Sequence, residues 1–195
     1  MNKDELKLIL NVHTEVLAEV LKIKYSEFQW EFWSDFKIEY PNYSHMIVPS
    51  AMITPIHLND IYEPFIVIND EYYDSNGSSF HLIQMIAHEL RHVWQFYENK
   101  QKWNRELELN PLKVNKDTSS ITEEGLQKYT NLEIEQDAFA FQIAYAWMIS
   151  KQKNVYFGEE IMGKFPVDFL TKVNKIYDSY IHRFQRTIKK LGLIL

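Results

Sequence analysis

The chain has 195 residues, of which 46% are hydrophobic and 15% aromatic, so it can bury a core and is expected to form a single domain spanning residues 1–195. Its formal net charge is −6 and its basic residues are scattered, which argues against nucleic acid as a partner. The absence of cysteine excludes disulfides, thiolate metal ligands and a cysteine nucleophile, and it fits the cytoplasm, where we expect the protein to reside.

A membrane span is not expected from this sequence. The most apolar run, residues 138–149, has twelve residues that include Gln142, whereas a span needs about 20 apolar residues. The first residues mix acidic side chains among the apolar ones, as an amphipathic helix does and an export signal does not. We therefore expect neither a transmembrane segment nor secretion.

The first part of the chain changes from a helical to a strand-like pattern. Apolar residues at helical spacing predict an amphipathic helix over residues 3–24. The segment that follows is rich in aromatic residues, β-branched residues and proline, and it predicts three short strands, at residues 45–48, 51–56 and 64–70. A turn is predicted at residues 74–79, where Asn, Gly and Ser cluster.

The rest of the chain is predicted to be mainly helical. Helical periodicity is found over residues 80–98, 126–150 and 167–191. The polar residues 99–125 form either a lid or a loop with small elements of its own. A helix, then strands, then helices indicate an α+β fold, in which a short, mostly antiparallel sheet packs against the helix of residues 80–98.

The clearest chemical signal is the run His88-Glu-Leu-Arg-His92. Residues four apart lie on nearly the same face of a helix, with Cβ atoms about 5–6 Å apart, so both imidazoles can bind one metal ion. Glu89 would then flank the open metal position, where it can take a proton from water. A chain of this composition contains the pattern by chance roughly 0.02 times, and apolar residues occupy the opposite face, so a metal site explains the pattern better than coincidence.

Two histidines need a third protein ligand, and a later helix offers acidic candidates. Glu133 and Asp137 are four residues apart, so Glu133 can bind the ion while Asp137 accepts a hydrogen bond from a ligand histidine. Glu135 points about 160° away from Asp137 around the helix and is expected to be solvated. The alternative for this cluster is an ordinary acidic helix start, which the helix dipole favours.

The two motifs together resemble those of the gluzincin zinc metallopeptidases, in particular the short, soluble minigluzincins. The resemblance rests on the histidine motif and on the run "EIEQDAFA" at residues 133–140, and it covers about residues 64–150. It implies a small zincin-like domain with long carboxy-terminal helices and one Zn²⁺ per chain. It also implies the same roles for Glu133, as ligand, and for Asp137, as the carboxylate behind the ligands.

The expected function is therefore zinc-dependent hydrolysis of peptide bonds in a peptide or protein substrate, with Glu89 as general base. The resemblance implies that a strand just before the motif helix, here residues 64–70, forms a sheet edge to which substrate adds; a plain core strand is the alternative. Tyr129 and His182 are candidate donors to the oxyanion. A latent or non-catalytic binding or regulatory protein that keeps the metal site, and hydrolysis of a non-peptide amide, remain as alternative functions.

Overall fold

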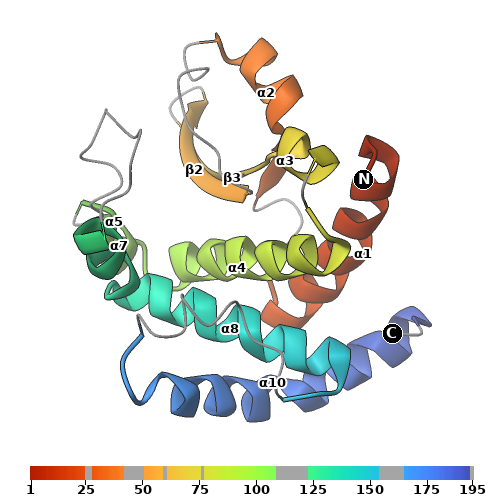
Figure 1. Cartoon of the computed structure of the whole chain (residues 1–195), viewed down its shortest axis with the longest axis vertical. Helices are drawn as coiled ribbons and strands as arrows, with labels where there is room; N and C mark the ends of the chain where they lie inside the picture. Colours follow the sequence, from red (N-terminus) through yellow and green to blue (C-terminus); the bar gives the residue numbers. More distant parts are fainter. Residues whose placement is uncertain are drawn as a thin grey trace. The chain divides into compact units, whose positions relative to one another are not determined.

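The computed structural model describes residues 1–24, 28–41, 51–58, 61–75, 77–108, 123–153 and 165–193. Helices make up most of these residues and one small sheet completes them, so the fold class is α+β, as predicted (Figure 1). The chain divides into two compact units, Met1–Trp94 and Gln95–Leu195, and the boundary falls inside one continuous helix.

The first unit begins with helix α1 (Lys3–Leu21), close to the predicted bounds. A capping box fixes its start: Asn2 accepts hydrogen bonds from the backbone N–H groups of Asp4 and Glu5, and Glu5 accepts one from the Asn2 backbone. The helix ends at Lys22, which adopts a left-handed conformation with φ of 62°. The apolar face of α1 is buried, as its periodicity predicted.

The sheet of this unit is mixed, which corrects the expectation of a mostly antiparallel sheet. Its strands are β1 (Gln29–Phe32), β2 (Ala51–Leu58) and β3 (Ile61–Ile68), in the order β1-β3-β2. The antiparallel pair β2–β3 corresponds to two of the predicted strands, whereas β1 was not predicted and pairs parallel to β3. The strand predicted at residues 45–48 lies outside the described residues.

Strand β3 occupies the centre of the sheet, so the expectation that it forms an edge for substrate is wrong. Ile68, for example, pairs with Phe32 of β1 on one side and with Ala51 of β2 on the other. The backbone of residues 65–68 is therefore paired on both sides, and the side chains of these residues are at most 5% exposed. The alternative, a plain core strand, is the correct one.

Two short helices flank the strands: α2 (Trp33–Glu39) and α3 (Asp70–Ser75). The buried carboxylate of Asp70, at the start of α3, accepts hydrogen bonds from the backbone N–H and the hydroxyl of Ser34 in α2, at 3.0 and 2.5 Å. Neither helix was predicted, because both are too short to show a helical period.

Helix α4 (Ser79–Glu98) follows, one residue longer than predicted. The hydroxyl of Ser78 accepts a hydrogen bond from the His81 backbone N–H at 3.1 Å and so caps its start. The histidine motif lies in the middle of α4, and all side chains from Ile86 to Val93 are buried. The segment that carries the motif is thus part of the core rather than of the surface.

The second unit contains the end of α4 and four further described helices: α5 (Lys100–Glu108), α7 (Glu123–Thr130), α8 (Glu133–Ser150) and α10 (Phe169–Leu191). The predicted helix over residues 126–150 is interrupted at Asn131 and Leu132, so that α8 begins at Glu133. Part of the 99–125 segment is helical, and its residues 109–122 lie outside the described ones.

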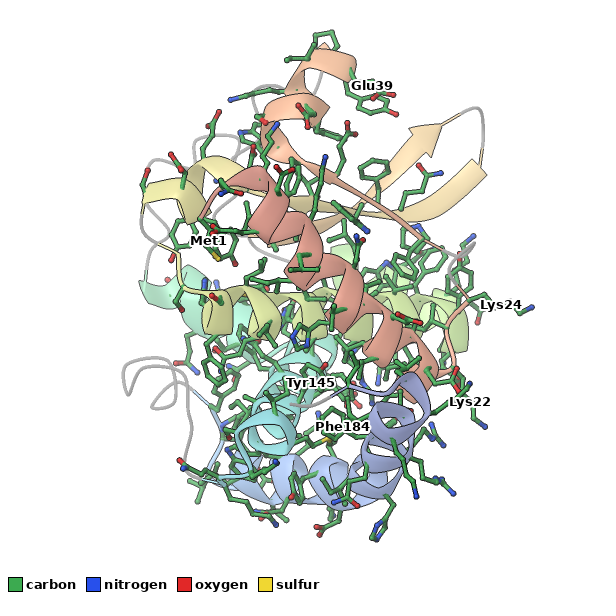
Figure 2. All side chains as sticks on the ribbon, turned by 90° about the vertical axis from the view of Figure 1, so that its right-hand side faces the viewer. Met1, Lys22, Lys24, Glu39, Tyr145 and Phe184 are labelled. Atoms are coloured by element: carbon green, nitrogen blue, oxygen red, sulfur yellow. The ribbon has the colours of Figure 1, made fainter. Side chains whose placement is uncertain are left out.

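Helices α8 and α10 lie side by side (Figure 1) and contact each other through pairs of aromatic rings. Phe141 meets Tyr180 edge to face at 5.4 Å, and Tyr145 meets Phe184 in the same way at 5.7 Å; Figure 2 labels the second pair. Burial raises the pKa of Tyr145 above its ordinary range.

Among the described residues, no helix combines the length and the apolarity that a membrane crossing requires.

Candidate metal centre

The two histidines of the motif converge on one point beside α4. His88 and His92 are each 3% exposed, and their Nε2 atoms lie 3.0 Å apart. Their rings are nearly perpendicular, at 85°, with centroids 4.6 Å apart. The spacing of four residues on a continuous helix produces this convergence, as predicted from the sequence.

The separation of the two nitrogens suits a shared metal ion. Two nitrogens bound at about 2.0–2.1 Å to one tetrahedral ion lie about 3.3–3.4 Å apart, a few tenths of an ångström more than the distance in this structure. Without an ion, the proton of one Nε2 has to point at the lone pair of the other. An ion between them would instead be bound by one ring nitrogen of each imidazole.

A third ligand atom comes from Glu135 in the first turn of α8. Atoms of His88, His92 and Glu135 that can bind a metal all lie within 4.8 Å of one another, and all three side chains are buried. Two imidazoles and one carboxylate form a typical three-residue metal-binding set. This group could therefore hold a metal ion.

Gln95, near the end of α4, is hydrogen-bonded to the first turns of α8. Its amide nitrogen donates to the backbone carbonyl of Ile134 at 2.9 Å and to Oδ2 of Asp137 at 2.8 Å. The expected partner of Asp137 was a ligand histidine; the hydrogen bond found here comes from Gln95. Asp137 nevertheless lies close to Glu135, two residues further along α8.

The structure corrects the choice of the third ligand. Glu133, the predicted one, is the first residue of α8, and its side chain is 66% exposed and forms an ion pair with Lys102 at 2.7 Å. Glu135, expected to be solvated, is 4% exposed and lies with the histidines. A usable signal was present in the sequence: Glu135 continues the buried row of Ala138 and Gln142 at spacings of three and seven residues.

Charged side chains beside the histidines on α4 are buried as well. Glu89 is 4% exposed and Arg91 5% exposed, and the Arg91 guanidinium lies 3.8 Å from the centroid of the Trp94 ring. Burying a charge is costly unless an opposite charge offsets it. A divalent cation bound by His88, His92 and Glu135 would add positive charge beside these buried carboxylates.

The two residues proposed as oxyanion donors lie on two different helices of the second unit. Tyr129, on α7, is half-buried and its ring meets that of Phe139 edge to face at 6.3 Å. His182, on α10, is exposed. His81, two turns before His88, contacts the hydroxyl of Tyr73 at 3.3 Å through Nδ1, and burial lowers its pKa.

Comparisons of the chain with protein-family models, with curated proteins and with solved structures give no match.

Proposed function

We propose that this chain is a zinc-dependent metallopeptidase whose ion is bound by His88, His92 and Glu135. The observation that carries the proposal is the buried convergence of two imidazoles and one carboxylate, with a second buried carboxylate, Glu89, next to the first histidine on the same helix. The pairing of three ligands with an adjacent acid is the arrangement that water-activating zinc sites use.

The donor set favours zinc among the common metal ions. Imidazole nitrogens suit Zn²⁺, Cu²⁺, Ni²⁺ and Fe²⁺, whereas Ca²⁺ and Mg²⁺ prefer oxygen ligands. Structural zinc sites usually have four protein ligands, while catalytic sites have three and leave one position for water. The group found among the described residues has three members, one of them a carboxylate, and this supports a hydrolytic role over a purely structural one.

Each residue has a definite role in the proposed reaction. When bound, zinc supplies Lewis-acid activation of water and of the scissile carbonyl. Glu89 accepts a proton from the attacking water as the new C–O bond forms, and it returns a proton to the amide nitrogen as the C–N bond breaks. His88 and His92 would hold the ion through one ring nitrogen each and take no part in these proton transfers.

One observation favours the second candidate, a latent or non-catalytic metal-stabilised binding protein. His88, Glu89 and His92 are at most 4% exposed in this structure, so a peptide cannot reach them without a rearrangement. In that case the metal stabilises the fold without turning over substrate.

The substitution Glu89→Gln separates the two candidates. It keeps the shape of the side chain but removes the base, so a peptidase is expected to lose at least about 10²-fold in rate while still binding zinc. The assay is hydrolysis of a mixed peptide library by the zinc-loaded protein. Glu98→Gln, an exposed glutamate on the same helix, is the matched control and should retain the rate. Zinc-loaded wild-type protein that cleaves no member of the library would favour the binding protein.

A further inference from the structure

Gln95 uses both hydrogens of its side-chain amide on the same turn of α8. One goes to the Ile134 carbonyl at 2.9 Å and the other to Asp137 Oδ2 at 2.8 Å. Glu135 lies between these two acceptors in the sequence. The amide of Gln95 therefore donates to groups on both sides of Glu135 in this turn. The Gln95 side chain itself is only 9% exposed.

The same residue lies on the helix that carries the two histidines. Gln95 lies three residues after His92 and seven after His88 on one continuous helix, which at about 100° per residue puts it on the face that carries both imidazoles. Backbone geometry within α4 fixes His88 and His92 relative to Gln95, and hydrogen bonds fix Gln95 relative to the start of α8. Gln95 thus connects the helix that carries the histidines to the turn that carries Glu135.

We propose that Gln95 is a positioning residue of the metal centre, which sets zinc affinity by holding the Glu135 turn at the distance the ion requires. The inference rests on the proposed zinc site. Both partners of Gln95 are acceptors, a carbonyl and a carboxylate, so the position requires a side chain with two N–H donors. Residues behind metal ligands typically change affinity by about 10- to 100-fold when they are replaced.

Two substitutions test the role of the donors. Gln95→Met keeps the approximate volume and removes both donors, and Gln95→Glu keeps the shape but faces the two acceptors with a carboxylate. Both are expected to weaken zinc binding by about 10- to 100-fold, measured by competition with a chromophoric chelator. Gln84→Met is the matched control, because Gln84 is a buried glutamine of the same helix, 4% exposed, one turn before His88. It should bind zinc within threefold of wild type.

Cobalt substitution separates positioning from general destabilisation. The visible spectrum of bound Co²⁺ reports the ligand set, so the Gln95→Met spectrum is expected to shift toward that of Glu135→Gln, while Gln84→Met keeps the wild-type spectrum. Circular dichroism of the metal-free proteins shows which variants remain folded, and Gln95→Glu, unchanged in shape, replaces Gln95→Met if the latter unfolds.

The outcomes distinguish this inference from the proposed function. Wild-type protein that binds no zinc would overturn the zinc site itself. Wild-type protein that binds zinc, with Gln95→Met binding it equally well or losing no more affinity than Gln84→Met, would overturn the role of Gln95 and leave the site standing.

Discussion

At the scale of single residues, burial decides which of the two glutamates at the start of α8 can serve as a ligand. Glu133 faces water and pairs with Lys102, so its charge is already compensated and screened. Glu135 is buried, and a buried carboxylate is stable only beside a compensating charge or several donors. A metal ion held together with His88 and His92 would provide such compensation, and this favours the buried acid over the exposed one as a ligand.

His13 provides a residue-scale prediction on pH dependence. Burial in α1 lowers its pKa from 6.5 to about 4, so the folded state binds its proton only at lower pH than the unfolded state does. Below pH 6.5 the unfolded state gains protons first, and stability falls until the pH reaches about 4. This group alone is expected to cost about 2 to 3 kcal/mol between pH 7.5 and 4.5.

Urea unfolding of the metal-free protein measures this effect. His13→Gln removes the titrating group, so its free energy of unfolding should fall less than that of wild type between pH 7.5 and 4.5, by about 2 to 3 kcal/mol. Above pH 7.5 the two stability curves should run parallel. Parallel curves over the whole range would show that His13 does not contribute to acid destabilisation.

The sequence predicted both histidines of the group found in the structure, but it predicted Glu133 as the third ligand where the structure has Glu135 beside them. Spacing of four residues was used to pair Glu133 with Asp137 on one face, on the assumption that Asp137 supports a histidine. In the structure Asp137 accepts from Gln95, a long-range contact that no local spacing reveals. The buried row through Glu135, Ala138 and Gln142 was a better guide than the pairing of two acids.

At the scale of elements, the aromatic pairs between α8 and α10 predict where a substitution in the second unit lowers the free energy of unfolding most. Phe184 is 5% exposed and packs edge to face on the fully buried ring of Tyr145. Phe184→Ala removes this ring and leaves a cavity, so it should lower the free energy of unfolding by about 3–5 kcal/mol.

Chemical denaturation provides the measurement, and the neighbouring residue provides the control. Gln185 is exposed on the same helix, and Gln185→Ala should change stability by less than about 0.5 kcal/mol. A loss below 1 kcal/mol for Phe184→Ala would contradict the packing between these helices.

The bounds of a helix were predictable where its apolar residues recur at helical spacing over several turns. The bounds of α4 and α10 agree with the sequence within two residues because each carries a long apolar stripe. The break before α8 was missed, because Asn131 and Leu132 contain neither the proline nor the glycine that usually marks a helix end. That break makes Glu133 the exposed first residue of a new helix.

At the scale of the whole chain, composition and periodicity were enough to predict an α+β fold but not the pairing of its strands. The parallel partner of β3 is β1, which is four residues long and lies in an aromatic-rich segment without an alternating pattern. Long-range strand pairing depends on tertiary contacts that local patterns do not contain. The sheet order, and with it the central position of β3, could therefore only come from the structure.

A bound metal ion is also expected to stabilise the folded state of the whole chain. Metal that binds only the folded chain stabilises it by mass action, by about 2.7 kcal/mol when its free concentration is 100 times Kd. The melting temperature should therefore rise when zinc is added to wild-type protein and fall back when a chelator removes it. Glu135→Gln should show a much smaller rise at the same zinc concentration, because it lacks the third ligand.

The most direct test of the central claim is the zinc content of protein purified without chelator or histidine tag, for wild type, Glu135→Gln and Glu133→Gln. The two variants change glutamates two residues apart on one helix, one buried with the histidines and one exposed. We predict about one zinc per chain in wild type and in Glu133→Gln, and zinc greatly reduced in Glu135→Gln. Zinc retained in Glu135→Gln and lost from Glu133→Gln, or absent from wild type even after zinc is added at neutral pH, would contradict the metal centre proposed for this chain.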